Sequence, residues 1–296
     1  MLLGIAIGDA FGAAYETKAM GSFSVDMTRY ATRQGIKEGC YTDDTQMSIA
    51  VAEVLASGSE RSMWSFAESF VKCYNRDKRK GYTSGFTSVL EQCRNGQDLM
   101  FTVGGNSEKN GAAMRSVPFG VLPKLEDALG AALQSAIVTH NTKKGLMSAM
   151  CIAAASHYFY YNKGEPKDVI GYCIKACIGY DSETDTYLKE LDRLQDIDSK
   201  ILLKGNIGVP CDAMITTGAV LYIASRFNEL KQVMMETVIL GGDTDTTASI
   251  TTGLSAIRLG LDTLNPFMLS DLENNAYGKD YLLQLGEKLF RKYPAQ

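Results

Sequence analysis

Histidine is scarce in this sequence, which has only two among 296 residues, along with six prolines and one tryptophan. Two histidines cannot supply a zinc site built from three of them. The seven cysteines are an odd number and make a poor disulfide framework, so Cys151 and Cys173 are expected to be small core residues. Any metal ion would therefore be held mainly by oxygen, which favours Mg²⁺ or Mn²⁺ over Zn²⁺.

The sequence also has no excess of positive charge. Lysine and arginine number 30 against 34 acidic residues, which gives a net charge of -4. A general nucleic-acid binder needs a basic face to neutralise phosphates, so the composition excludes that class. At 45% hydrophobic and 22% charged, the chain has enough apolar residues to form a core, which excludes global disorder.

Long apolar runs are missing as well. The first eight residues are mostly apolar, but they lack a basic region and are followed at once by Asp9. The longest other apolar stretch, Met147 to Tyr161, is shorter than a membrane span needs. We therefore expect a cytoplasmic protein with reduced cysteines and no association with membranes.

Helical periodicity dominates the sequence. Apolar residues from Met47 to Leu55 recur at the spacing of one helix face, and this helix is expected to end near Gly58. Further helices are expected around Phe66 to Tyr74 and Leu129 to Ala136, and over residues 145–161, 167–178, 184–195, 213–227, 229–239, 246–259 and 281–293. Glycine-containing loops are expected at residues 78–85 and 103–111, and a polar surface segment at 181–210.

Signs of other structure are few. Only Ser22 to Thr28 has a strand-like pattern, and it is weak. Neither a linker rich in proline and serine nor a repeat of 20–50 residues divides the chain. The sequence therefore predicts an all-α fold with a single domain over residues 1–296.

Two pairs of aspartates mark the starts of predicted helices. Residues 42–45 read Thr-Asp-Asp-Thr, and residues 241–246 read Gly-Gly-Asp-Thr-Asp-Thr. Helix capping is the simpler interpretation, because Thr42 or Asp43 could accept the free N–H groups of the first turn. A cap needs only one side-chain oxygen, however, and no preceding glycine pair, which permits a sharp turn and a close approach.

If the two segments meet in space, their four carboxylates would repel one another strongly. Two divalent cations would relieve that repulsion, and ligands that are all oxygen suit Mg²⁺ or Mn²⁺.

The start of the chain adds a third feature. Glycines at positions 4, 8 and 12 fall on one helical face and permit close contact with another helix, and Glu16 follows at the same spacing. Asp9 lies between them, and a buried aspartate satisfied by hydrogen bonds is its simplest interpretation.

Together these features resemble the ADP-ribosylglycohydrolase family over nearly the whole chain. The resemblance rests on four motifs in order: Gly8-Asp9 with Glu16, residues 42–45, residues 110–115 (Asn-Gly-Ala-Ala-Met-Arg) and residues 241–246. It implies a compact orthogonal helical bundle with a metal-lined cleft that holds two divalent cations, Mg²⁺ or Mn²⁺.

The resemblance also implies roles for particular residues. It assigns the metal ions to Thr42, Asp43, Asp44, Asp243, Asp245 and Thr246, and the substrate to Gly81, Tyr82, Gly85, Ser107, Asn110, Gly111, Met114 and His140. Glu16 and Asp44 are the candidates for general acid and base. Thr83 and Lys109 depart from the family pattern, which has glycine at both positions, and His140 could instead be an ordinary, partly buried histidine.

The function implied is hydrolysis of the glycosidic bond at ribose C1, which removes ADP-ribose from an acceptor such as an arginine side chain of a protein. A monomer is expected. Three alternatives stay open: a non-catalytic ADP-ribose-binding or blocking protein, another two-metal hydrolase such as a phosphoesterase, and a helical structural protein with capped aspartates.

Overall fold

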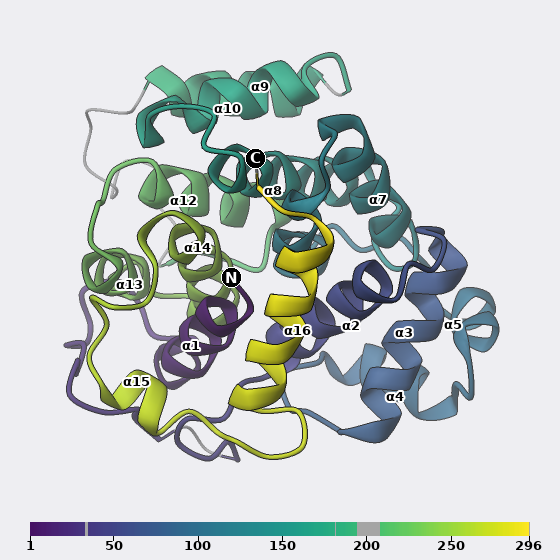
Figure 1. Ribbon diagram of the computed structural model, residues 1–296, viewed down its shortest axis with the longest axis horizontal. Coiled ribbons are helices and arrows are strands. Elements are labelled where there is room, and N and C mark those ends of the chain that lie inside the picture. Colours follow the sequence, from purple (N-terminus) through teal and green to yellow (C-terminus); the bar gives the residue numbers. More distant parts are fainter. Residues whose placement is uncertain (33–34, 181, 194–207, 296) are drawn as a thin grey trace.

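Helices make up nearly all the regular structure of the computed structural model, which describes residues 1–32, 35–180, 182–193 and 208–295 (Figure 1). They are α1 (Leu2–Gly12), α2 (Asp43–Ser57), α3 (Met63–Arg76), α4 (Ser84–Gln92), α5 (Gly96–Thr102), α6 (Gly111–Met114), α7 (Leu125–Ile137), α8 (Lys143–Tyr160), α9 (Val169–Cys177), α10 (Ser182–Arg193), α12 (Ala213–Ala224), α13 (Leu230–Ile239), α14 (Thr244–Leu259), α15 (Phe267–Ser270) and α16 (Lys279–Lys292). The described residues form no sheet, only two isolated bridges. The all-α prediction is confirmed.

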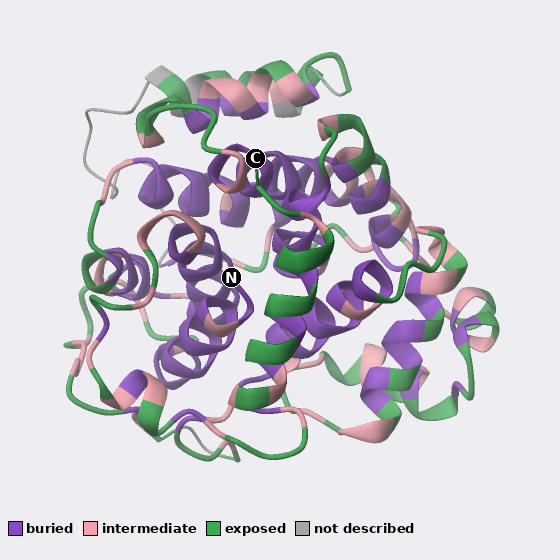
Figure 2. Ribbon diagram, viewed as in Figure 1, coloured by how far each residue is buried: buried purple, intermediate pink, exposed green. Residues whose placement is uncertain are grey.

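Helices α1 and α14 pack against each other at the centre of the molecule, and both are almost wholly buried (Figure 2). Glycine makes this contact possible, because a Cβ atom on Gly8 would lie 2.2 Å from the carbonyl oxygen of Ala248. A Cβ on Gly12 would lie equally close to the carbonyl oxygen of Thr244. The predicted glycine face is therefore confirmed as a helix contact. Glu16 is not on that face, because α1 ends at Gly12 and a short 3₁₀ turn follows.

Local sequence explains several helix ends. Thr142 caps α8 by accepting a hydrogen bond from the backbone N–H of Gly145. Asp212 caps α12 by accepting from Met214 and Ile215. Gly58 follows α2 with a φ of 81°, a left-handed conformation that glycine adopts without strain. The prediction that α2 ends near Gly58 is confirmed.

Other local predictions are wrong. Residues 22–28 form no strand, because Asp26 instead accepts hydrogen bonds from the backbone and hydroxyl of Thr28 in a turn. Gly85 lies in the first turn of α4 and not in a loop, since Thr83 caps that helix. In the polar segment 181–210, α10 is described, whereas Asp181 and residues 194–207 lie outside the described residues.

The hydrophobic core includes buried residues from Met1 to Leu289 and takes in Cys151 and Cys173, as expected. The single domain stays a prediction. Among the described helices, none combines the length and apolar character that crossing a bilayer requires.

Candidate active site

The start of α2 is capped by a side chain from another helix. Asp9 on α1 is fully buried and accepts hydrogen bonds from the backbone N–H of Thr42 at 2.9 Å and of Thr45 at 3.0 Å. It also accepts from the hydroxyl groups of the same two threonines, at 2.8 and 2.6 Å. Because Asp9 takes over the capping, capping by Thr42 or Asp43 is wrong for this helix. The carboxylates of Asp43 and Asp44 are left for another purpose.

The start of α14 is shaped by the glycine pair before it. Gly241 and Gly242 have φ values of 69° and 79°, in the left-handed region that favours glycine. A Cβ on Gly242 would lie 2.2 Å from the carbonyl oxygen of Val209, and one on Gly241 would lie 2.4 Å from that of Lys18. The close approach expected from the sequence is therefore to the protein's own backbone.

At this second corner, Asp245 accepts a hydrogen bond from the first-turn N–H of Thr246 at 2.9 Å, but the residue at the cap position does not cap α14. Asp243 occupies the cap position without a side-chain cap hydrogen bond. Its Oδ2 accepts instead from the side-chain amide of Asn110 at 2.8 Å, and the same amide donates to the hydroxyl of Thr216 at 3.0 Å. Asn110 therefore holds the second acidic corner in place, which its position in the sequence did not reveal.

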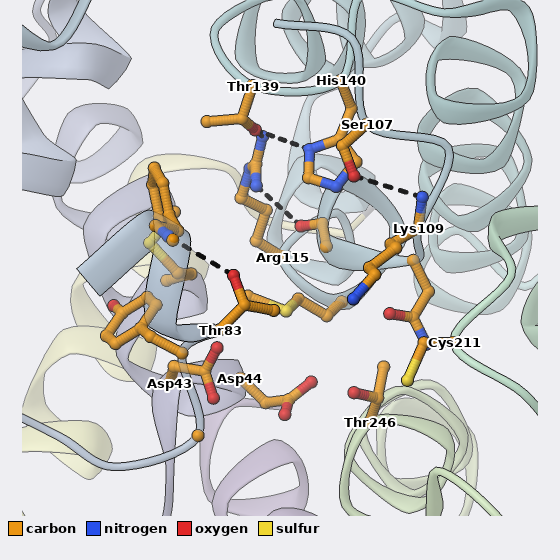
Figure 3. Close-up of a pocket in the computed structure, with 18 of the residues that line it drawn as sticks. Asp43, Asp44, Thr83, Ser107, Lys109, Arg115, Thr139, His140, Cys211 and Thr246 are labelled. Atoms are coloured by element: carbon orange, nitrogen blue, oxygen red, sulfur yellow. Dashed lines mark hydrogen bonds between the residues drawn. The ribbon is translucent and has the colours of Figure 1, made fainter. Parts of the chain in front are cut away.

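The two acidic corners meet at one pocket of about 440 Å³, part of which is drawn in Figure 3. Of the residues assigned to the site from the sequence, those that line this pocket are Glu16, Asp43, Asp44, Gly81, Tyr82, Gly85, Ser107, Asn110, Gly111, Met114, His140, Asp243, Asp245 and Thr246. Thr42 does not line it, because its hydroxyl group is turned to Asp9. The structure thus brings together segments from both ends of the chain.

Electrostatic strain is concentrated in these carboxylates. Burial raises the pKa of Asp44 well above its usual range, and the charges of Asp43, Asp9 and Asp243 raise it further. Burial likewise raises the pKa of Asp43, and the charge of Asp9 raises it further. Burial also raises the pKa of Asp245, where the next contribution is the charge of Asp243. Such a group of acids favours bound protons or cations at neutral pH.

The chemistry of these residues fits a divalent cation of the Mg²⁺ or Mn²⁺ type, because all the side-chain donors are carboxylate or hydroxyl oxygens. Oδ1 of Asp44 is buried and has no hydrogen-bond partner among the described residues. Among the residues that the structure describes, no three Asp, Glu, His or Cys side chains lie close enough together to hold a metal ion by themselves. The protein would therefore supply only part of a coordination shell.

Next to the first corner, the loop before α4 touches the carboxylates. Gly81 has a φ of 111°, and a Cβ there would overlap Asp43, so only glycine fits. The hydroxyl group of Tyr82 donates to Gln46 at 2.8 Å, and its ring lies 5.8 Å from that of Phe86.

Several pocket residues were missed by sequence reasoning. Four of them have apolar side chains: Met47, Phe86, Val89 and Val103. Thr83 followed by Phe86 and Val89 at helical spacing was the signal available for α4. Cys211 also lines the pocket, and nothing in its local sequence marks it.

An all-α bundle with two acidic helix starts at one pocket defines a class of helical proteins with a carboxylate-lined site. The profile of the ADP-ribosylglycohydrolase family matches residues 1–296, and the chain belongs to this family.

Individual relatives are similar to the chain over most of its length. The chain is 24% identical to ADP-ribosylhydrolase ARH3 of Xenopus tropicalis, over 99% of this chain and 94% of the relative. It is 25% identical to the ADP-ribosyl-[dinitrogen reductase] glycohydrolase of Rhodospirillum rubrum, over 92% and 88%. A solved structure of an ADP-ribosylglycohydrolase-related protein complex has a similar fold, with a TM-score of 0.74 at 22% identity, covering 98% of this chain and 95% of that one.

Proposed function

We propose that the protein hydrolyses the glycosidic bond at ribose C1 and so releases ADP-ribose from a modified acceptor. The observation that carries this proposal is the meeting of both acidic corners and Glu16 at one pocket, in a chain of this family. The pocket volume of about 440 Å³ lies within the range of small-molecule sites.

We further propose that Asp43, Asp44, Asp243, Asp245 and Thr246 hold two divalent cations, with water or substrate oxygens completing the coordination. Thr42 is left out of this set, because its hydroxyl group donates to Asp9 and it does not line the pocket. Bound cations would offset the repulsion among the carboxylates, orient ribose hydroxyl groups and lower the pKa of a nearby water. The buried, unpartnered oxygen of Asp44 supports this assignment.

Glu16 is the better candidate for the proton-transferring group, with Asp44 as the other. Glu16 is only partly buried and follows the 3₁₀ turn after α1, outside both acidic corners. Its charge contributes to raising the pKa of Asp43 and of Asp245, after burial and nearer aspartates, so it faces the same space. A carboxylate held by a metal ion is a weaker base, which favours Glu16 for moving a proton at C1.

The acceptor is proposed to be a protein side chain, with arginine the first candidate. The relative from Rhodospirillum rubrum is named for a protein acceptor, dinitrogen reductase, which supports this choice. The test is a panel of ADP-ribosylated arginine and serine peptides, each assayed with Mg²⁺ and with Mn²⁺, with products identified by mass spectrometry.

The products separate the possibilities. Free ADP-ribose and an unmodified peptide are expected, and the arginine peptide should react fastest. A phosphate-containing fragment of ADP-ribose would instead indicate a phosphoesterase. Tight binding of ADP-ribose without turnover of any substrate would indicate a binding or blocking protein.

A further inference from the structure

A buried guanidinium group lies on the side of the pocket away from the acidic corners. Arg115 is 1% exposed, and among the described residues it forms no ion pair. Its donors go to uncharged oxygens: the carbonyl of Gly111 at 2.7 Å, the hydroxyl and carbonyl of Ser135 at 3.1 and 3.0 Å, and the hydroxyl of Thr139 at 2.8 Å. The ring of Phe70 lies 4.7 Å from the guanidinium carbon.

The contact with Thr139 fixes the direction of a hydrogen bond. A guanidinium group only donates, so Oγ1 of Thr139 accepts from Arg115. The same Oγ1 lies 2.6 Å from Nδ1 of His140 (Figure 3). Thr139 is buried, and its hydroxyl has no other acceptor among the described residues. If the ring donated to Thr139, the hydroxyl hydrogen would be left buried without a partner, which is unfavourable.

The arrangement that satisfies every group has Arg115 donating to Thr139 and Thr139 donating to Nδ1 of His140. Nδ1 is then unprotonated, and the ring proton lies on Nε2. Nε2 lies on the side of the ring away from Thr139 (Figure 3), and His140 lines the pocket beside Gly111. Nε2 has no hydrogen-bond partner within the described part of the chain.

We propose that Thr139, oriented by Arg115, is a positioning residue that holds His140 in its neutral Nε2–H tautomer and so presents one N–H donor to an anionic oxygen of the ligand. With the proton fixed on Nε2, the ring can bind only a ligand atom that accepts a hydrogen bond. A ring that exchanged freely between its two tautomers could bind a ligand donor as well. That the anionic oxygen belongs to ADP-ribose rests on the proposed function, whereas the tautomer itself does not.

The uncharged state of the ring agrees with its surroundings. Burial, followed by the charges of Arg115 and Lys109, lowers the pKa of His140 to about 3. Burial lowers the pKa of Arg115 to about 9, which leaves it charged at neutral pH.

The scarcity of histidine makes the tautomer directly measurable. The only other histidine, His157, lies at 3.0 Å from the Tyr172 hydroxyl and does not line this pocket. In a His157→Gln background without a histidine tag, ¹⁵N NMR of labelled histidine reports on His140 alone. At pH 7 we expect an unprotonated Nδ1 and a protonated Nε2. A protonated Nδ1, alone or on a doubly protonated ring, would overturn the proposal without any further variant.

Three variants test the positioning role. Thr139→Ser keeps the hydroxyl and should retain the tautomer, whereas Thr139→Val and Arg115→Lys should show a mixture of tautomers. Circular dichroism and the unfolding temperature establish that each variant is folded. Wild-type spectra from both Thr139→Val and Arg115→Lys would contradict the proposal, because the side chains would then be structural only.

Binding of ADP-ribose, measured by calorimetry, tests the ligand. Thr139→Val should weaken it about three- to tenfold, the worth of one hydrogen bond, and Thr139→Ser should restore it. Unchanged affinity in Thr139→Val would overturn the role in ligand binding. If the expected tautomer is found but the wild-type protein does not bind ADP-ribose, the proposed function fails and the tautomer assignment stands.

Discussion

At the scale of single residues, the site depends on which side chain satisfies which backbone group. The carboxylate of Asp9 accepts four hydrogen bonds, from the backbone N–H and the hydroxyl groups of Thr42 and Thr45. Asp43 and Asp44 are therefore left without a capping role. Without Asp9, the two carboxylates at the start of α2 would be explained by capping and by the positive end of the helix dipole. Their availability is the physical basis for expecting a cation there.

Asp44→Asn tests that expectation. The substitution keeps the shape but removes a charge and the buried carboxylate oxygen, so release of ADP-ribose should fall at least about 100-fold. Calorimetric titration with Mn²⁺ should show weakened binding in the same variant. The matched control is Asp262→Asn, which changes an exposed aspartate outside the pocket and should alter neither quantity. Full activity and unchanged Mn²⁺ affinity in Asp44→Asn would sink the metal assignment.

Asp9→Ala should act on stability. It removes the acceptors of four buried donors, and each orphaned donor costs ~1–3 kcal/mol, so the free energy of unfolding should fall by several kcal/mol. Urea unfolding followed by circular dichroism measures the change. Asp26→Ala, which removes hydrogen bonds at an exposed turn, should lower the free energy of unfolding far less. Equal effects of the two substitutions would contradict the capping role of Asp9.

The low pKa of His140 has a defined consequence for stability. Folding favours the neutral ring, so the stability that this contributes is complete above about pH 6.5 and declines as the pH falls toward 3. At pH 5 about 2 kcal/mol of it should be lost. The difference in free energy of unfolding between wild type and His140→Gln, measured in urea from pH 8 to pH 5, should shrink by that amount. A constant difference would show that the ring titrates normally.

At the scale of helices, the packing of α1 on α14 is set by residues without side chains. Gly8→Ala would place its Cβ 2.2 Å from a backbone oxygen of α14, where neither partner can yield easily. We expect a loss of ~1–3 kcal/mol or more in unfolding free energy. Because α1 carries Asp9 and α14 carries Asp245, turnover should fall as well.

Gly130→Ala is the matched control for this substitution. Gly130 lies within α7, is exposed, and has open space around its Cβ position. Alanine there should stabilise the protein by about 0.5–1 kcal/mol, since alanine favours the helix. If Gly8→Ala were equally stabilising, the tight contact between α1 and α14 would not exist.

Helix periodicity in the sequence predicted α2, α8, α12 and α14 because each repeats an apolar spacing over several turns. The short helices α4 and α5 were not predicted. The seven residues of α5 span too few turns to show a periodicity, whereas the helical spacing of Phe86 and Val89 in α4 was present but was assigned to no helix. The acidic corners were predictable because the two aspartates of each corner are adjacent or only one residue apart in the sequence. The capping by Asp9 and the bond from Asn110 to Asp243 were not, because those partners meet only after folding.

At the scale of the whole molecule, the pocket joins segments from both ends of the chain, so ligands that bind there should stabilise the entire fold. Exhaustive removal of divalent ions with a chelator should abolish release of ADP-ribose, and Mg²⁺ or Mn²⁺ should restore it. The unfolding temperature should rise with added Mn²⁺, since a cation at 100 times its dissociation constant contributes about 2.7 kcal/mol. Activity retained after complete metal removal would count decisively against the two-cation proposal.

One consequence follows from the two contacts that α1 makes. Asp9 holds the first corner, and the carbonyl of Gly12 accepts from Thr244 at the second, so less than one helical turn separates the two attachments. A residue inserted between them would rotate one attachment by about 100° relative to the other. The spacing of the two acidic corners is therefore tied to the length of this one turn. Designed changes in pocket size should therefore leave the length of this turn unchanged.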